Sequence, residues 1–268
     1  MKIKNITNSC FCKALLNGIC YFSVIVTFDC NLQCKNCIKC SPLVGQKNLN
    51  FPEIDYEKTC ESIKYFKNLG LKMVNISGGE PLLYPKIFDL IRFCKRLGLY
   101  TTVNTNGLLI PKIKLPDDIL SLLKSDGMHF TVSMKGKYFD NSKAIDFLEK
   151  NKLHYTIADF GNYEFYKVKL FKEKNLDTKP LFKCIGSVPQ IINDKIYLCS
   201  VAFRKEIFNL DWIENDLCFK YDHFKSFKDI KNALTKKFKL CQNCSVFQKL
   251  ELEEISKSSL KIEEFVEV

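Results

Sequence analysis

Four cysteines lie within eleven residues of this chain, in the stretch "CNLQCKNCIKC" at 30–40. Thiols this close together can form disulfides, bind zinc or hold an iron–sulfur cluster. Cys30, Cys34 and Cys37 also share a helical spacing, but the residues between them are polar and poor helix formers. Zinc would need a fourth ligand, for which Cys40 is available, whereas three thiolates would leave one iron of a four-iron cluster open.

A second group of cysteines lies near the other end of the chain. Two of them form "CQNC", and the other two lie at the ends of a segment with the pattern of a short hairpin. The four residues are Cys184, Cys199, Cys241 and Cys244. Zinc ribbons use cysteine pairs of this kind, and so do iron–sulfur proteins.

The elements that would position these residues alternate regularly in the first part of the chain. Buried strands are predicted at 21–27, 71–77, 99–105, 127–133 and 152–158, and helices at 56–70, 85–98, about 117–125 and 141–151. This alternation predicts βαβ units and a parallel sheet, in which ligands bind beyond the carboxyl ends of the strands. The cysteine loop, "GGE", "TNG" and "SMKG" each follow a strand directly, so we expect them to meet at one edge.

The pattern changes after residue 175. "PQIINDKIYLCS" predicts two short strands around a turn at Asn193-Asp194. "SFKDIKNALTKKF" predicts a helix that begins with a capping box of Ser226 and Asp229. We therefore expect a first domain at 1–175, a small second module at 176–250 and a tail at 251–268.

"CNLQCKNC" after the first strand and "SGGEP" after the second resemble the radical S-adenosylmethionine superfamily. The resemblance implies a partial (β/α)6 barrel of the TIM type, covering roughly residues 20–160, and a cluster that reductively cleaves S-adenosylmethionine to a 5′-deoxyadenosyl radical. The cluster ligands that it implies are Cys30, Cys34 and Cys37. The residues that it implies near S-adenosylmethionine are Gly78, Gly79, Glu80, Thr105, Asn106 and Ser133. One departure is Asn36, because the family usually has an aromatic residue before the third cysteine.

The second cysteine group resembles the SPASM and Twitch extensions of that superfamily. Asp194 stands where those extensions have a glycine, and no cysteine follows Cys244. The resemblance therefore implies the shorter Twitch type, a small α+β module with a β-hairpin and one further 4Fe–4S cluster held by all four cysteines. Structural zinc is the alternative. The predicted fold is thus α/β, a partial barrel followed by this module, with two 4Fe–4S clusters and S-adenosylmethionine as cofactors.

The function that this resemblance implies is hydrogen abstraction from a small substrate. We expect oxidation or epimerisation of a sugar or aminocyclitol carbon, with the second cluster taking part in electron transfer and a flavodoxin- or ferredoxin-type protein as reductant. The alternatives are a peptide- or protein-modifying maturase and, among non-enzymes, an iron–sulfur electron carrier or zinc-binding module. The sequence does not identify a general base. His129 and His154 fall inside predicted strands, and Asp159 is the better-placed carboxylate.

Composition excludes several other classes. The net charge of +11 suggests a nucleic-acid partner, but the lysines are scattered among Phe, Ile and Asn, so none is expected. Hydrophobic residues make up 46% of the 268, enough for a large core, and no apolar run is long enough for a membrane span. The first residues are too polar for a signal peptide, so we expect a cytoplasmic protein in which 14 cysteines favour metal over disulfides.

Overall fold

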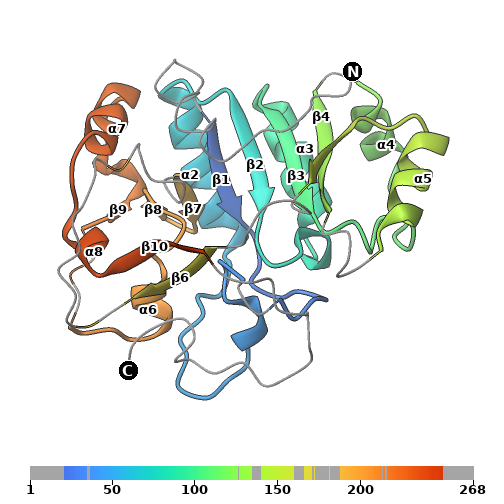
Figure 1. Cartoon of the computed structure of the whole chain (residues 1–268). Helices are drawn as coiled ribbons and strands as arrows, with labels where there is room; N and C mark the ends of the chain where they lie inside the picture. The colour runs from blue at the N-terminus through green and yellow to red at the C-terminus, as the bar shows by residue number, and fades with distance from the viewer. Residues whose placement is uncertain are drawn as a thin grey trace.

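The protein is built on one mixed sheet of eight strands, in the order β5-β4-β3-β2-β1-β7-β8-β9 (Figure 1). This computed structural model describes residues 21–34, 37–125, 127–134, 140–159, 166–170, 172, 181, 188–212, 214 and 216–249. The strands of the main sheet are β1 (Tyr21–Ile25), β2 (Met73–Ser77), β3 (Tyr100–Thr105), β4 (Met128–Met134), β5 (Tyr155–Asp159), β7 (Gln190–Ile192), β8 (Lys195–Tyr197) and β9 (Cys218–Lys220). A second, two-stranded sheet pairs β6 (Tyr166–Leu170) with β10 (Cys244–Lys249).

Six neighbouring strands of the main sheet run in the same direction. Strands β1 to β4 each pair in parallel with the next strand, ending at β5, and β7 pairs in parallel with the other edge of β1. The prediction of an α/β chain with a partial TIM-type barrel is confirmed. Strands β8 and β9 then follow antiparallel, so the predicted hairpin extends the barrel's own sheet.

The helices that the sequence predicts are present as α2 (Tyr56–Asn68), α3 (Ile87–Arg96), α4 (Asp117–Leu123), α5 (Ser142–Lys150) and α7 (Phe227–Leu234). Two short helices, α6 (Arg204–Ile207) and α8 (Lys239–Gln242), were not predicted. Short 3-10 turns are η1 (Ser41–Leu43), η2 (Pro81–Leu83) and η4 (Tyr221–His223). The Asp55 side chain caps α2 by accepting from the Lys58 N–H, and the predicted capping box of Ser226 and Asp229 is present at α7.

The C-terminal elements share the hydrophobic core of the first half. The ring of Phe22 on β1 lies 4.8 Å from Phe66 on α2 and 5.5 Å from Phe227 on α7, between ring centroids. All three side chains are buried in one cluster with residues of β7 and β8. Burial of aromatic rings from both ends of the chain therefore joins the two halves.

The hairpin turn is also tied to the start of α2. Asn193 has a φ of 54°, the left-handed conformation that the Asn-Asp pair predicts. Its side-chain amide donates to the Glu53 carbonyl (2.8 Å) and accepts from the Asp55 N–H (2.8 Å). The turn that joins β7 to β8 is thereby fixed against the helix that follows the cysteine loop. In the part of the chain that the structure describes, no helix has the length and apolar character needed to cross a bilayer.

Candidate functional site

The first cysteine group lies on the loop beyond the carboxyl end of β1, where the lower ends of the parallel strands meet in Figure 1. Cys30, Cys34 and Cys37 are all half-buried. The Leu32 N–H donates to the sulfur of Cys30 at 3.4 Å, and the Cys37 N–H donates to the carbonyl of Cys34 at 3.1 Å. Burial is the main reason that the pKa of Cys30 is raised to about 12, and the nearby groups Cys37, Glu80 and Cys34 contribute to this rise. The loop thus gathers the three thiols near Glu80.

The glycines of "GGE" allow the end of β2 to approach the chain that leads into the cysteine loop. The Gly79 N–H donates to the Thr27 carbonyl (2.8 Å), and the Glu80 N–H donates to the Asp29 carbonyl (2.8 Å). A Cβ atom on Gly78 would collide with the Thr27 carbonyl oxygen, and one on Gly79 with that of Asp29. These two positions therefore require glycine, because backbone packs directly on backbone there.

Glu80 is fully buried, with 0% exposure, and its carboxylate joins the ends of β2 and β3. Oxygen Oε1 accepts from the Thr105 hydroxyl (2.8 Å) and the Leu82 N–H (3.1 Å), and Oε2 accepts from the Asn106 N–H (2.9 Å). Burial raises the pKa of Glu80, while these three hydrogen bonds act in the opposite direction. A carboxylate has about four acceptor positions, so one remains for a ligand donor such as an ammonium.

Asn106 links this carboxylate to the cysteine loop. Its side-chain Nδ2 donates to Oδ1 of Asn31 at 2.7 Å and lies 4.0 Å from the sulfur of Cys30. The backbone N–H of Asn106 donates to Oε2 of Glu80. Ends of β1, β2 and β3 that are far apart in sequence are therefore joined in one polar network.

Ser133, the remaining residue predicted near the cofactor, joins this network through Asn141. The Asn141 Nδ2 donates to the carbonyl oxygens of Ser133 (3.1 Å) and Asn106 (3.3 Å). The Ser133 hydroxyl itself donates to the Asn104 side chain at 3.3 Å. The structure thus brings the predicted residues of the first site to one edge. The residues of "SMKG" after Met134 lie outside the described part of the chain.

Two members of the network, Asn31 and Asn141, were not identified from the sequence. Asn31 stands inside the cysteine loop, so its position in the motif was a usable signal. Asn141 precedes α5, where asparagine is expected to cap the helix. Its side chain makes no capping hydrogen bond and donates to the Asn106 carbonyl instead.

The donor set at this edge fits a 4Fe–4S cluster. Soft thiolates are the usual ligands of such clusters, and the three thiols lie on one short loop beside a glycine-lined backbone. Among the residues that the structure describes, no three Cys, His, Asp or Glu side chains are gathered tightly enough to share a single metal ion. A cubane differs from a single ion because each thiolate binds a different iron, which requires a wider spacing.

The second cysteine group is described for three of its four members. Cys199 follows β8 and is buried, Cys241 lies within α8 and is half-buried, and Cys244 begins β10 and is buried. Cys184 lies outside the described residues. The assignment of these four residues to one cluster stays a prediction.

His129 and His154 lie within hydrogen-bonding distance of other residues of the fold. The Tyr100 hydroxyl lies 2.7 Å from Nδ1 of His129 near the amino ends of β3 and β4, and burial is the main reason that the pKa of His129 falls to about 4. His154 Nδ1 lies 3.1 Å from the Ser125 carbonyl. The prediction that both belong to the scaffold rather than to catalysis agrees with these contacts. The structure describes the backbone of Asp159 and not its side chain.

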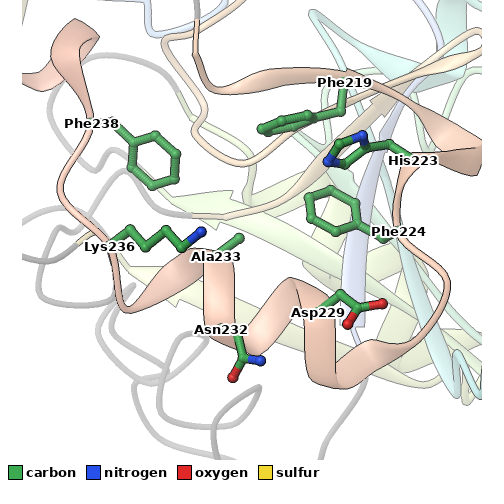
Figure 2. A pocket seen from close by; sticks show the side chains of 8 residues that line it. All are labelled: Phe219, His223, Phe224, Asp229, Asn232, Ala233, Lys236 and Phe238. Atoms are coloured by element: carbon green, nitrogen blue, oxygen red, sulfur yellow. The ribbon is translucent and has the colours of Figure 1, made fainter.

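A cavity of about 360 Å³ lies elsewhere, between β9, η4 and α7. Figure 2 shows the rings of Phe219, His223 and Phe224 on one side of it, and Lys236 and Phe238 on the other. The His223 ring stacks on Phe219 with centroids 4.6 Å apart. In Figure 1, α7 lies at the opposite end of the molecule from the cysteine loop, so this cavity is separate from the site described above.

The parallel sheet carries three candidate cluster ligands, Cys30, Cys34 and Cys37, and the buried carboxylate of Glu80 at one edge, an arrangement that suits an α/β enzyme with a cofactor at the carboxyl ends of its strands. A profile of the Radical SAM superfamily matches residues 24–158, half of the chain. The chain belongs to this superfamily. Membership implies a 4Fe–4S cluster and S-adenosylmethionine as cofactors.

Relatives within the superfamily have diverse activities. A GTP 3′,8-cyclase from Chlorobaculum tepidum is 32% identical over 137 residues, which are 47% of this chain and 40% of that protein. A PqqA peptide cyclase from Gluconobacter oxydans is 31% identical over 90 residues, 34% of this chain and 24% of that protein. The chain thus spans less than half the length of these curated relatives.

One solved structure resembles the chain over most of its length. The crystal structure of BtrN in complex with AdoMet and 2-DOIA superposes with a TM-score of 0.51, covering 88% of this chain and 96% of BtrN. At 18% identity, this likeness concerns the fold alone.

Proposed function

We propose that this radical S-adenosylmethionine enzyme abstracts hydrogen from a small substrate and oxidises or epimerises a sugar or aminocyclitol carbon. The observation that carries the proposal is the end-to-end likeness to BtrN, which covers 88% of this chain and 96% of BtrN. BtrN was crystallised with AdoMet and 2-DOIA, a small molecule. A chain of similar extent and fold suits a substrate of similar size.

In this proposal Cys30, Cys34 and Cys37 hold the catalytic cluster. When bound, the cluster supplies the electron that cleaves S-adenosylmethionine to the radical that abstracts hydrogen. Glu80 keeps the ends of β2 and β3 together and offers its remaining acceptor position to the ligand ammonium. Asn106 fixes the cysteine loop against that carboxylate through Asn31.

The second cysteine group would hold a further 4Fe–4S cluster in a Twitch-like module at 176–250. Four thiolates leave no open iron, so this cluster would exchange electrons with the substrate and not bind it. An oxidation removes two electrons, and hydrogen abstraction accounts for one of them. The second cluster is the proposed acceptor of the other, and a flavodoxin- or ferredoxin-type protein is the proposed reductant.

A peptide substrate is the second candidate. The observation that favours it is the 31% identity to a PqqA peptide cyclase, which covers 34% of this chain. Incubation of reduced enzyme with candidate sugars, aminocyclitols and peptides separates the two candidates. Product formed only from the peptides would replace the first proposal by the second.

The experiment that tests the cofactors is metal analysis of anaerobically reconstituted protein. We expect about eight irons per chain, present as two four-iron clusters. Replacing all three of Cys30, Cys34 and Cys37 by Ala should leave about four irons and abolish 5′-deoxyadenosine formation with dithionite. About one zinc and four irons in the unchanged protein would contradict the second cluster and favour structural zinc.

A further inference from the structure

One face of the parallel strands is apolar and the other is polar. Side chains alternate between the two faces along a strand, and register partners on neighbouring strands share a face. On β4, Phe130 (1% exposed) and Val132 (0%) point into the apolar core, whereas His129, Thr131 and Ser133 point the other way and are partly exposed. Parallel strands are normally apolar on both faces, and aliphatic side chains fill the inside of a closed TIM barrel. Core packing therefore does not explain the polar face.

The polar face extends over three neighbouring strands. The register pairs Asn104 on β3 with Thr131 on β4, and Thr131 with Thr156 on β5, and all three side chains are partly exposed. The Thr156 hydroxyl donates to Oγ1 of Thr131 (3.2 Å), and the Ser133 hydroxyl donates to Oδ1 of Asn104 (3.3 Å). We call these four residues, Asn104, Thr131, Ser133 and Thr156, the polar patch.

The polar patch begins at the candidate site. The Ser133 carbonyl accepts from Nδ2 of Asn141, which also donates to the Asn106 carbonyl. Thr131 lies two residues before Ser133 on the same strand, which places it about 7 Å further from the edge of the sheet. A ligand on the patch would therefore lie next to the edge that carries the cysteine loop and Glu80.

The polar patch has hydrogen-bonding capacity left and no charge. Within the residues that the structure describes, Nδ2 of Asn104 has no hydrogen-bond partner, and each threonine hydroxyl keeps an acceptor position. The described positions of this face on β1 to β5 include no Lys, Arg, Asp or Glu. His129 on the same face is neutral at pH 7, because burial is the main reason that its pKa falls to about 4. Lys39 contacts the sheet on the other side of β1, through Gln190 on β7 (2.6 Å).

We propose that the polar patch binds the reacting ring of the substrate, and that this ring is an uncharged polyol, a sugar or cyclitol without amino or phosphate groups. Ring hydroxyls both donate and accept, which matches the amide of Asn104 and the hydroxyls of Thr131 and Thr156. A bound phosphate would need cations and a bound ammonium a carboxylate, and this face carries neither in its described part. The inference rests on the proposed function and narrows its substrate class.

The first test is a matched panel of deuterated rings, given with S-adenosylmethionine to the reconstituted, reduced enzyme. The panel contains glucose, galactose and myo-inositol, each beside an amino and a phosphate derivative of the same ring. Deuterium in 5′-deoxyadenosine identifies a ring that has lost hydrogen. We expect transfer from at least one uncharged ring, with a lower KM than for its charged derivatives.

The outcomes of this panel separate the two proposals. Transfer from no ring, whether or not a peptide reacts, would reject the proposed function and this inference together. Transfer from rings with a lower KM for an amino or phosphate derivative than for its parent would leave the proposed function standing and reject the uncharged ring.

Variants then test the polar patch itself. Thr131→Val and Thr156→Val keep the shape of the side chain and remove one hydroxyl, so each should raise KM for the uncharged ring about two- to tenfold. Thr101→Val is the matched control, because Thr101 lies on β3, is 2% exposed and points to the opposite face. Its KM should stay near that of the unchanged enzyme.

A change of preference distinguishes recognition from a merely structural role. Asn104→Asp keeps the shape and adds a negative charge, so KM for the amino derivative should fall roughly tenfold relative to the parent ring. Iron content and circular dichroism identify the variants that keep the fold, and any one of the three is sufficient. The polar patch is overturned if a folded threonine variant has the KM of Thr101→Val, or if a folded Asn104→Asp protein keeps the original preference.

Discussion

The most informative single change is Glu80→Gln, because it replaces a buried carboxylate with an amide of nearly the same shape. The carboxylate accepts from Leu82, Thr105 and Asn106. The Gln amide has only one oxygen, so its NH2 group takes the place of either Oε1 or Oε2 of Glu80 and cannot accept a hydrogen bond there. In either orientation one backbone N–H, that of Asn106 or that of Leu82, loses its acceptor.

The expected cost follows from that lost acceptor. An unsatisfied buried donor costs about 1–3 kcal/mol. The burial that raises the pKa of Glu80 works against its charged form, so a neutral amide recovers part of this loss. We therefore expect the free energy of unfolding to fall by about 1–2 kcal/mol, which lowers the melting temperature by roughly 2–8 °C for a chain of this size.

The same change should weaken the ligand site. The carboxylate of Glu80 has one acceptor position left for a ligand ammonium. In Glu80→Gln the side chain is neutral, so a hydrogen bond from that ammonium is no longer strengthened by a negative charge. Affinity for S-adenosylmethionine should fall roughly ten- to hundredfold, measured by titration calorimetry on cluster-loaded protein. The iron content should not change, since no thiol is altered.

Glu61→Gln is the matched control, because Glu61 is exposed on α2. It should leave both the melting temperature and the affinity near those of the unchanged protein. A Glu80→Gln protein that melts at the control temperature and binds S-adenosylmethionine normally would refute the assignment of Glu80 as the link between β2, β3 and the ligand.

Two further predictions concern the second cluster and the scaffold. Cys241 and Cys244 replaced together by Ala should still allow 5′-deoxyadenosine formation but abolish the oxidised product, provided that circular dichroism shows a folded protein; a folded variant that forms product at the normal rate would contradict electron transfer through this cluster. His129 has a pKa of about 4 in the fold, below its ordinary 6.5, so its contribution to stability is present above pH 6.5 and is lost as the pH falls toward 4. Between pH 7 and 5 the unfolding free energy should therefore fall by on the order of 2 kcal/mol more than in His129→Gln, measured by urea titration; equal slopes would show that His129 is not buried in its neutral form.

Local patterns in the sequence predicted much of the fold. Apolar β-branched runs separated by amphipathic helices predicted β1 to β5 within a few residues, because these patterns depend on neighbours along the chain. The turn at Asn193 and the capping box at Ser226 were predicted for the same reason. The spacing of Cys30, Cys34 and Cys37 together with "SGGEP" was enough to indicate the superfamily, which the profile match at 24–158 establishes.

Contacts between distant segments were decided only by the tertiary structure. The sequence did not show that β7 would pair with β1 and carry the hairpin into the main sheet, because strand pairing depends on the packing of the whole sheet. It gave no reason to connect Lys39 with Gln190, which lie 151 residues apart. Nor did it show that Oε1 of Glu80 would accept from the Leu82 N–H in η2 and Oε2 from the Asn106 N–H after β3. A sequence motif specifies which groups are present, whereas their hydrogen-bond partners, burial and surrounding charge exist only once the strands have been brought together.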